Sequence, residues 1–558
     1  MAAPWELIAS QKRAAQAAAI PPEWKLSPSA LPPPSLLDVR SIPATCGILT
    51  PEELAITTKY DATSLLSALH SRSLTSLAVA TAFCKRAAIA HQLTTCLTEI
   101  FFDRALARAA ELDAYISLHE RPMGPLHGLP ISLKDTFDIA GLDSSIGIAA
   151  LANKPAAKNS ALVDILLSAG AVLYVKTNVP QTLMALDSTN NLFGRVLNPA
   201  NRLLTAGGSS GGEGALLALR GSLLGVGTDV GGSIRIPALC NGLYGLKPSV
   251  GRVPYAGQIS AMRASGHLGL QASAGPLATS VRDLRLFLSV VADAAPWDTQ
   301  ADVVPGSWES QGQAGGEWER PVFGVIRSDG VVTPLPPVAR ALDDTVAALR
   351  GAGLEVVEVD APALRRCQGL ANKFFGAGGH NEMLDLLAET REPLIAWLAS
   401  RIRRRPARDV KFLEDRHGER DALVREMLRV FRTEDGRRVD AVILPVAPHP
   451  TPEIDRWNAV GYTSAFVLLD WAAGVVPVGV VGRGDLEAEV EGEVLGNWDK
   501  RGRELWGAKE EREVYLGSSL AVQVVVPRLQ ERRLWQAMEI VDAVVREKQE
   551  GKGGRARL

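Results

Sequence analysis

The stretch "GTDVGGSIRIP", Gly227 to Pro237, is the most informative segment of this 558-residue chain. It places a serine behind two glycines, with an acidic residue before them and an arginine and a proline after them. A second cluster of the same kind, "GGSSGGEGA" from Gly207 to Ala215, lies just upstream. Serines in such loops either form turns and caps or act as nucleophiles. Glycine at this density costs conformational entropy on folding, so the region is expected to need close backbone approach or unusual dihedral angles.

Apolar strand patterns alternate with helical patterns on both sides of this segment. Upstream, residues 129–135 and 171–178 predict buried strands, and residues 159–170 between them predict a helix that ends at Gly170. Downstream, residues 321–360 repeat the order of strand, helix and strand. Such alternation predicts an α/β layer architecture.

Charge and cysteine usage narrow the range of partners and cofactors. The chain has 60 Lys and Arg residues and 62 Asp and Glu residues, which gives a formal net charge of −2. It therefore lacks the excess positive charge that would attract nucleic acid or anionic lipid. The five cysteines contain no C-x-x-C pair, which is typical of a reducing compartment and not of a zinc knuckle. The eight histidines show no H-E-x-x-H spacing. We therefore expect no metal, no cofactor and no nucleic acid partner.

The two ends of the chain are expected to lie outside the main domain. Residues 1–56 hold helical fragments broken by prolines and predict an extension wrapped on the surface, before a single domain over 57–548 and a flexible tail over 549–558. No apolar run approaches the roughly 18 residues that a membrane span requires, and the N-terminus lacks the pattern of a secretory signal. A cytoplasmic protein is therefore expected. The alternative is the peroxisome, because the C-terminal Ala556-Arg557-Leu558 resembles the S-K-L targeting signal. The same three residues are also compatible with a frayed basic tail.

A phosphate-binding loop or plain turns explain the glycine-serine region poorly. A P-loop needs G-x-x-x-x-G-K-[ST], and in the dinucleotide pattern begun by Gly225 and Gly227 the last glycine is replaced by Val230. Glycine turns with serine caps explain an isolated serine well. They explain less well two such loops so close together in an apolar stretch.

A nucleophile elbow is the runner-up mechanism. Gly207 to Gly211 matches G-x-S-x-G, which would make Ser209 the nucleophile of an α/β-hydrolase. The elbow must follow a buried strand, whereas the preceding "NPANRLLTA" contains Pro199 and makes a poor central strand. The elbow also needs a histidine later in the chain, and none of the candidates lies in a sequence context that indicates a catalytic role. These candidates are His267, His380, His417 and His449.

A Ser-Ser-Lys relay would use both loops at once. Ser233 would be the nucleophile, Ser209 the bridge, and Lys134 in "GPLHGLPISLKDTFDI" the base. A lysine acts as a base only when neutral, so desolvation must lower its pKa by several units. Lys134 ends an apolar run, which directs its stem into the core. The structural alternative is a strand-end lysine paired with Asp135.

Four segments together resemble the amidase signature family. In chain order they are "GPLHGLPISLKD", "KTNVPQ", "GGSSGGEGAL" and "GTDVGGSIRIPALCNGLYGLKPS". The N-terminal extension and residues 461–479, "GYTSAFVLLDWAAGVVPVG", resemble the fungal acetamidase branch of that family. The resemblance implies one large α/β domain, with a twisted mixed β-sheet covered by helices on both faces. It also implies hydrolysis of a carboxylic acid amide to carboxylate and ammonia or amine, without a cofactor.

The resemblance carries over to individual residues. Lys134 matches the family's base, Ser209 its bridging serine in a cis peptide bond, and Ser233 the serine that forms the acyl-enzyme. The backbone N–H groups expected to form the oxyanion hole are those of Val230, Gly231, Gly232 and Ser233. Leu183 aligns with a position that lines the pocket of the scissile group, where methionine is common. The residues expected to hold the loops by hydrogen bonds are Ser210, Asp229 and Arg235.

Two other assignments stay open at this level. They are a serine esterase with Ser209 as its nucleophile, and an amidotransferase-type subunit that works only with partners. The expected partner is a small-molecule amide, and a homodimer is compatible with the sequence.

Overall fold

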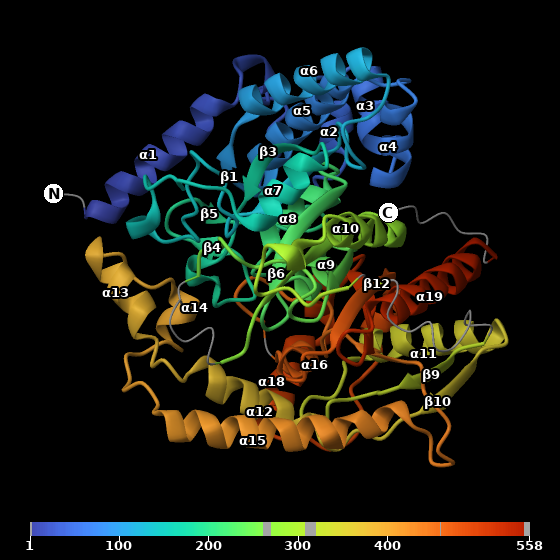
Figure 1. Cartoon of the computed structure of the whole chain (residues 1–558). Coiled ribbons are helices and arrows are strands. Elements are labelled where there is room, and N and C mark those ends of the chain that lie inside the picture. Colours follow the sequence, from blue (N-terminus) through green and yellow to red (C-terminus); the bar gives the residue numbers. More distant parts are fainter. Residues whose placement is uncertain (1–2, 261–268, 307, 309–319, 458, 552–558) are drawn as a thin grey trace.

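A mixed sheet of 11 strands forms the centre of the molecule (Figure 1). The computed structural model describes residues 3–260, 269–306, 308, 320–457 and 459–551. In spatial order the strands are β1 (Leu97–Ile100), β3 (Val172–Thr177), β2 (Pro130–Lys134), β6 (Leu224–Asp229), β8 (Ser273–Ala278), β7 (Tyr244–Lys247), β12 (Ala472–Val480), β13 (Ser519–Val526), β11 (Ala441–Pro445), β9 (Val322–Val325) and β10 (Glu355–Glu358). β2 pairs in parallel with β3 and β6, and β9 pairs in parallel with β10 and β11, whereas the remaining pairs are antiparallel. A separate pair joins β4 (Thr189–Asn190) to β5 (Gly194–Arg195).

Helices make up most of the remaining regular structure. They are α1 (Pro4–Ala19), α2 (Ile42–Thr45), α3 (Pro51–Lys59), α4 (Ala62–His70), α5 (Ser76–Thr94), α6 (Phe102–His119), α7 (Ala161–Ser168), α8 (Gly211–Ala218), α9 (Arg235–Asn241), α10 (Val281–Asp293), α11 (Pro336–Gly351), α12 (Leu364–Phe375), α13 (Asn381–Glu389), α14 (Ala396–Ala399), α15 (Val410–Met427), α16 (Gly461–Leu468), α17 (Arg483–Leu486), α18 (Asn497–Trp506) and α19 (Glu531–Gly551). None of the helices in these described ranges combines the length and the apolar character that crossing a membrane would need.

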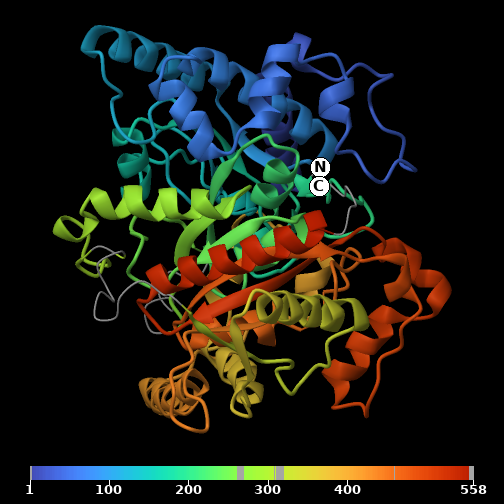
Figure 2. The same cartoon turned by 90° about the vertical axis from the view of Figure 1, so that its right-hand side faces the viewer.

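The helices cover both faces of the sheet, as β13 shows residue by residue. Successive side chains of a strand point to opposite faces. Val524 and Val526 belong to a buried apolar cluster that includes Met538 of α19, whereas Val525 belongs to another that includes Phe466 of α16. In Figure 2, α10, α11 and α19 lie in front of the sheet. The predicted α/β fold, a mixed sheet between helices, is therefore confirmed.

The elements predicted upstream and downstream of the glycine-serine region are confirmed. β2 and β3 lie where strands were expected, and α7 lies between them, followed by Gly170 at a φ of +91°. Residues 321–360 contain β9, α11 and β10 in the predicted order. The parallel register pairs Ser132 of β2 with Gly225 of β6, so the carboxyl ends of these two strands lie side by side. That edge is where α/β sheets place their sites.

The N-terminal segment lies against the main body of the protein. Lys12 of α1 is buried, and its Nζ lies 2.9 Å from Asp143 Oδ2 and also contacts Glu99. The domain boundary expected after residue 56 falls inside α3, so that helix continues from the predicted extension into the predicted domain.

Candidate active site

Lys134 is the last residue of β2 and is completely buried. Its Nζ lies 2.7 Å from Ser209 Oγ, 2.8 Å from Thr228 Oγ1 and 3.3 Å from the Thr228 carbonyl oxygen. Asp135 instead faces Lys176, at 3.7 Å, and accepts a hydrogen bond from Thr98. The alternative of a strand-end lysine paired with Asp135 is therefore wrong.

The surroundings of Lys134 favour its neutral form. Burial lowers the pKa of this amine to about 7, and the carboxylates of Asp229 and Glu213 oppose that shift. Desolvation disfavours the charged form of any buried amine. The structure thus meets the physical requirement for a lysine that accepts a proton near neutral pH.

Ser209 lies in a loop that packs closely against neighbouring backbone at Gly208. The peptide bond between Gly208 and Ser209 is cis. A Cβ on Gly208 would lie 2.8 Å from the carbonyl oxygen of Ala185, so only glycine fits there. The segment before Ser209 contains only two isolated bridges, one between Leu197 and Thr205 and one between Leu204 and Glu453.

The requirements of a nucleophile elbow are not met at Ser209. The elbow needs a buried strand directly before the serine, and this chain has a loop there. His380 occupies the N-cap position of α13, the His417 ring lies tilted against Phe374, and the His449 ring meets Trp457 edge-on. None of these three hydrogen-bonds to Ser209 within the described ranges, and His267 lies outside them.

Ser233 lies beside Ser209 in the loop between β6 and α9. Its carbonyl oxygen accepts a hydrogen bond of 3.2 Å from the Ser210 backbone N–H, and its side chain is nearly buried. The structure therefore brings Lys134 and Ser209 into direct contact and holds Ser233 next to them through the backbone. In the described part of the chain, no hydrogen bond joins the hydroxyls of Ser209 and Ser233. Ser210 Oγ lies buried without a partner there.

An ion pair inside the protein fixes the shape of the Ser233 loop. Arg235 Nε and Nη2 donate to the carboxylate of Asp229 at 3.0 and 3.1 Å, and both side chains are buried. Burial alone would raise the pKa of Asp229, but ion pairing with Arg235 holds it below its usual range. Asp229 also accepts from the N–H groups of Gly232, at 2.7 Å, and Ile234, at 3.2 Å. The Gly232 N–H thus donates to Asp229 and does not take the place in the oxyanion hole that was expected for it.

Two distant residues complete this network, and sequence reasoning missed both. Thr463 at the start of α16 donates from Oγ1 to the Gly231 carbonyl oxygen at 2.6 Å, and its own carbonyl accepts from Arg235. Gln523 of β13 accepts from Arg235 at 3.2 Å. Gly232 has a φ of +130°, and a Cβ there would collide with Thr463 Oγ1. The second glycine of the motif is therefore required by close packing as well as by its dihedral angle.

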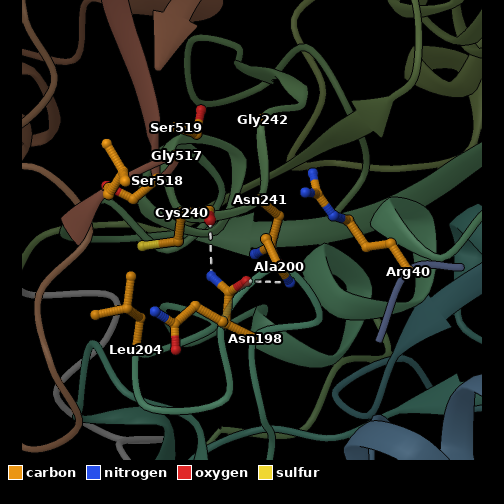
Figure 3. Close-up of a pocket in the computed structure, with 12 residues that line it drawn as sticks. Arg40, Asn198, Ala200, Leu204, Cys240, Asn241, Gly242, Gly517, Ser518 and Ser519 are labelled. Carbon is orange, nitrogen blue, oxygen red and sulfur yellow. Dashed lines mark hydrogen bonds between the residues drawn. The ribbon is translucent and has the colours of Figure 1, made fainter. Parts of the chain in front are cut away.

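Two asparagines clamp the segment before Ser209 to α9, the helix that follows Ser233, as Figure 3 shows for Asn198. Asn198 Nδ2 donates to the carbonyls of Thr205 and Cys240 at 3.0 and 2.8 Å. Asn241 Nδ2 donates to the carbonyls of Ala206 and Pro237 at 2.8 and 2.9 Å. Both amides line a small pocket beside this clamp. Lys134, Ser209 and Ser233 do not line that pocket.

Leu183 lies in a strained turn at the edge of the site. Thr182 and Leu183 both adopt left-handed backbone conformations, with φ of +66° and +67°, which cost roughly 1–2 kcal/mol per residue outside glycine. The Leu183 side chain is partly buried against an apolar cluster that includes Met383 and Leu398. The residue expected to line the substrate pocket thus packs against a cluster to which α13 and α14 also contribute.

The structure offers no cluster that points to a metal. Among the described residues, no group of three or more His, Cys, Asp or Glu side chains is placed to hold a metal ion.

Comparison with known proteins identifies the family. A family model described as "Amidase" matches residues 78–535, most of the chain. The chain belongs to the amidase family. It is an amide-hydrolysing enzyme.

Individual relatives agree with this assignment over nearly the full length. The enzyme is 39% identical over 541 residues to an acetamidase of Emericella nidulans, an alignment that covers 95% of this chain and 96% of that protein. It is 37% identical to an acetamidase of Aspergillus oryzae, with 97% and 98% covered. Among solved structures, a fatty acid amide hydrolase matches with a TM-score of 0.87 and 30% identity, covering 96% of this chain and 94% of that one. The expected likeness to fungal acetamidases is confirmed.

Proposed function

We propose that the enzyme hydrolyses carboxylic acid amides through a Ser-Ser-Lys relay, with an acyl-enzyme on Ser233. The observation that carries the proposal is the 2.7 Å distance between Nζ of the buried Lys134 and Oγ of Ser209. Because burial lowers the pKa of Lys134 to about 7, a neutral amine is available near that pH to accept a proton. The backbone bond from Ser210 to Ser233 supports the nucleophile's place beside this pair.

The reaction follows from these positions. Neutral Lys134 accepts the hydroxyl proton of Ser209, and Ser209 takes the proton of Ser233 as Ser233 Oγ attacks the amide carbonyl carbon. The relay then returns the proton to the leaving nitrogen while the C–N bond breaks, which releases ammonia or an amine. Water attacks the resulting ester and gives its proton back through the relay. Hydrolysis regenerates Ser233 and releases the carboxylate.

Backbone donors of the Ser233 loop would stabilise the developing oxyanion. Preorganised N–H donors of this kind contribute about 2.7–4 kcal/mol each in other enzymes. Because the Gly232 N–H is bound to Asp229, we assign this role to the N–H groups of Val230, Gly231 and Ser233. The buried ion pair of Asp229 with its arginine fixes the loop in advance, which is what preorganisation requires.

The relatives also favour a class of substrate and a set of partners. Two of them carry the name acetamidase, which favours a small amide with a short acyl group, and Leu183 would contact that group. We propose that no nucleic acid takes part, and that a homodimer is the oligomeric state to test. A cytoplasmic location fits the composition. The peroxisomal alternative depends on Ala556-Arg557-Leu558, which lies outside the described residues.

The domain limits are part of the same proposal. We assign catalysis to residues 57–548, with 1–56 as an N-terminal extension packed on that domain and 549–558 as a tail. The buried contacts of Lys12 with Glu99 and Asp143 support the packing of the extension.

Ammonia release from a panel of aliphatic and aryl amides tests the proposal. The purified enzyme alone should hydrolyse at least one of them, whereas Ser233→Ala and Lys134→Ala should not. Ser222→Ala is a matched control, because Ser222 is a buried serine whose hydroxyl donates to the Leu224 carbonyl oxygen, and no hydrogen bond in the described part of the chain joins it to the three relay residues. Activity only after addition of partner proteins would favour an amidotransferase-type subunit. Hydrolysis of esters but not amides, lost in Ser209→Ala and kept in Ser233→Ala, would favour the esterase.

A further inference from the structure

A buried carboxyl group lies behind the relay and has no part in the steps above. Glu213 of α8 is fully buried. Its Oε2 accepts a hydrogen bond of 2.6 Å from Ser132 Oγ, and its Oε1 accepts one of 2.9 Å from Thr177 Oγ1. Both of these donors are uncharged hydroxyls. A carboxylate taken out of water needs more than that, because the desolvation of a full charge is far costlier than that of a neutral acid.

The fold aims this carboxyl at the strand that carries the relay base. Ser132 and Lys134 are two residues apart on β2, so both side chains point to the same face of the sheet. Thr177 is the neighbour of Lys134 in the register between β2 and β3. On the other side, a Cβ on Gly225 of β6 would overlap Glu213 Oε2. The chain thus leaves a space in the sheet that is filled by the Glu213 carboxyl.

Glu213 and Lys134 affect each other's charge. Burial raises the pKa of Glu213 to about 7, while the bonds from Ser132 and Thr177 and the charge of Lys134 oppose that rise. Burial lowers the pKa of Lys134 to the same region, and Glu213 in its charged form opposes that fall. The two groups therefore compete for a proton in the same pH range.

The other titratable groups near this pair stay in one charge state. Burial raises the pKa of Cys96 to about 12 and holds that of Tyr174 on β3 well above its usual value, so both are neutral. On α9, Arg235 is paired with Asp229 of β6. From α5, Arg86 donates to the Leu219 carbonyl at the far end of α8. The segment of β8 that packs against α8 has no titratable side chain.

We propose that Glu213 is a positioning residue that holds a proton in place of Lys134, so that carboxyl and amine are neutral together when the relay works. The inference rests on the proposed relay. An ammonium with a carboxylate carries as many protons as an amine with a carboxylic acid, so the exchange balances and needs no other reactant. A neutral Glu213 removes the negative charge that would keep Lys134 protonated. Through this charge effect Glu213 sets the pH at which the base becomes active.

The pH dependence of fluorophosphonate labelling at Ser233 tests this role. Labelling needs neutral Lys134, so its rate should fall as the pH is lowered. The pH at which the rate is half-maximal then reports the apparent pKa of the Lys134 amine. Glu213→Gln mimics the neutral acid and should shift this midpoint to lower pH, by about one unit. Thr177→Val removes one donor to the carboxylate, favours the protonated acid, and should shift the midpoint in the same direction by less.

Glu392→Gln is the matched control. Glu392 is also buried and is bound by uncharged donors, the Ala149 N–H and Gln181 Nε2 among them, but it does not act on Lys134. Its midpoint should equal that of the wild type. A wild type that is not labelled on Ser233 would overturn the relay itself. Normal wild-type labelling with an unmoved midpoint in Glu213→Gln would overturn the role of Glu213 alone. If Glu213→Gln does not fold, an unmoved midpoint in Thr177→Val has the same meaning.

Discussion

Replacing Lys134 with methionine should abolish amide hydrolysis and also remove a pH dependence of stability. The amine is completely buried, and burial lowers its pKa from 10.5 to about 7. Each pKa unit corresponds to about 1.4 kcal/mol, so below pH 7 this group lowers the free energy of unfolding by roughly 5 kcal/mol. Methionine keeps the apolar stem but leaves the hydroxyls of Ser209 and Thr228 without their partner, at about 1 kcal/mol each. The net expectation at pH 7 is a variant roughly 2–3 kcal/mol more stable than the wild type.

The sign of the pH effect follows from the protons bound in each state. Between pH 7 and 10.5 the unfolded chain carries a proton on Lys134 and the folded chain does not. The stability of the wild type therefore rises with pH across this window and is lost as the pH falls toward 7. The variant lacks this group, so its advantage should shrink by roughly 1.4 kcal/mol per pH unit between pH 8 and 10.

Equilibrium urea unfolding at several pH values, followed by tryptophan fluorescence, measures this difference. Ser209→Ala is the control, because it removes the hydroxyl partner at 2.7 Å but keeps the amine. It should show the same pH slope as the wild type. Parallel stability profiles of wild type and Lys134→Met from pH 7 to 10 would refute the reasoning, because the lysine would then keep its ordinary pKa and stay charged.

Three further predictions concern the Ser233 loop and the strand β6 that leads into it. Ser233→Ala should lower kcat by about 10⁴–10⁶ in an ammonia-release assay without changing the thermal midpoint, and retained turnover would exclude it as the nucleophile. Thr463→Val removes the 2.6 Å hydrogen bond to the Gly231 carbonyl and should lower the free energy of unfolding in urea by about 1–3 kcal/mol. It should also lower kcat with little change in KM. An unchanged kcat would show that this hydrogen bond to the loop does not affect catalysis. Gly225→Ala adds a methyl group that would overlap the Glu213 carboxyl, so it should lower the free energy of unfolding by about 3 kcal/mol. A variant with wild-type stability would show that the carboxyl moves freely.

The sequence allowed prediction of the parts that have a local pattern. The apolar run before Lys134 predicts a buried strand with a buried lysine at its end, and both are found. The pairing of Asp229 with Arg235 joins two residues only six positions apart in the motif. Glycines flanking the two serines predict close backbone contacts, and the atoms around Gly208 and Gly232 provide them.

The rest depends on contacts between segments far apart in the chain. Thr463 reaches Gly231 across 232 positions of sequence, and no local spacing encodes such a contact. Asn198 and Asn241 look like ordinary loop residues until the fold places them at the same clamp. A signal for Glu213 did exist, because it is a lone acid in an otherwise apolar, glycine-rich helix. Its partners on two other strands are visible only in the folded chain.

Two strands could not be predicted from local sequence patterns, because their residues have low β-propensity. β8 reads "SAGPLA" and β7 reads "YGLK", and glycine and proline are typical of turns and not of central strands. Tertiary packing overrides that preference here: Gly275 of β8 lies so close to the Leu246 carbonyl of β7 that no side chain would fit.

Peptide mapping of a fluorophosphonate adduct tests the central claim most directly. The purified enzyme is treated with the reagent, digested and examined by mass spectrometry, with Lys134→Ala treated in parallel. The relay predicts an adduct on Ser233 that forms far more slowly in Lys134→Ala. An adduct on Ser209, or an adduct on Ser233 that forms equally fast without the lysine, would contradict it.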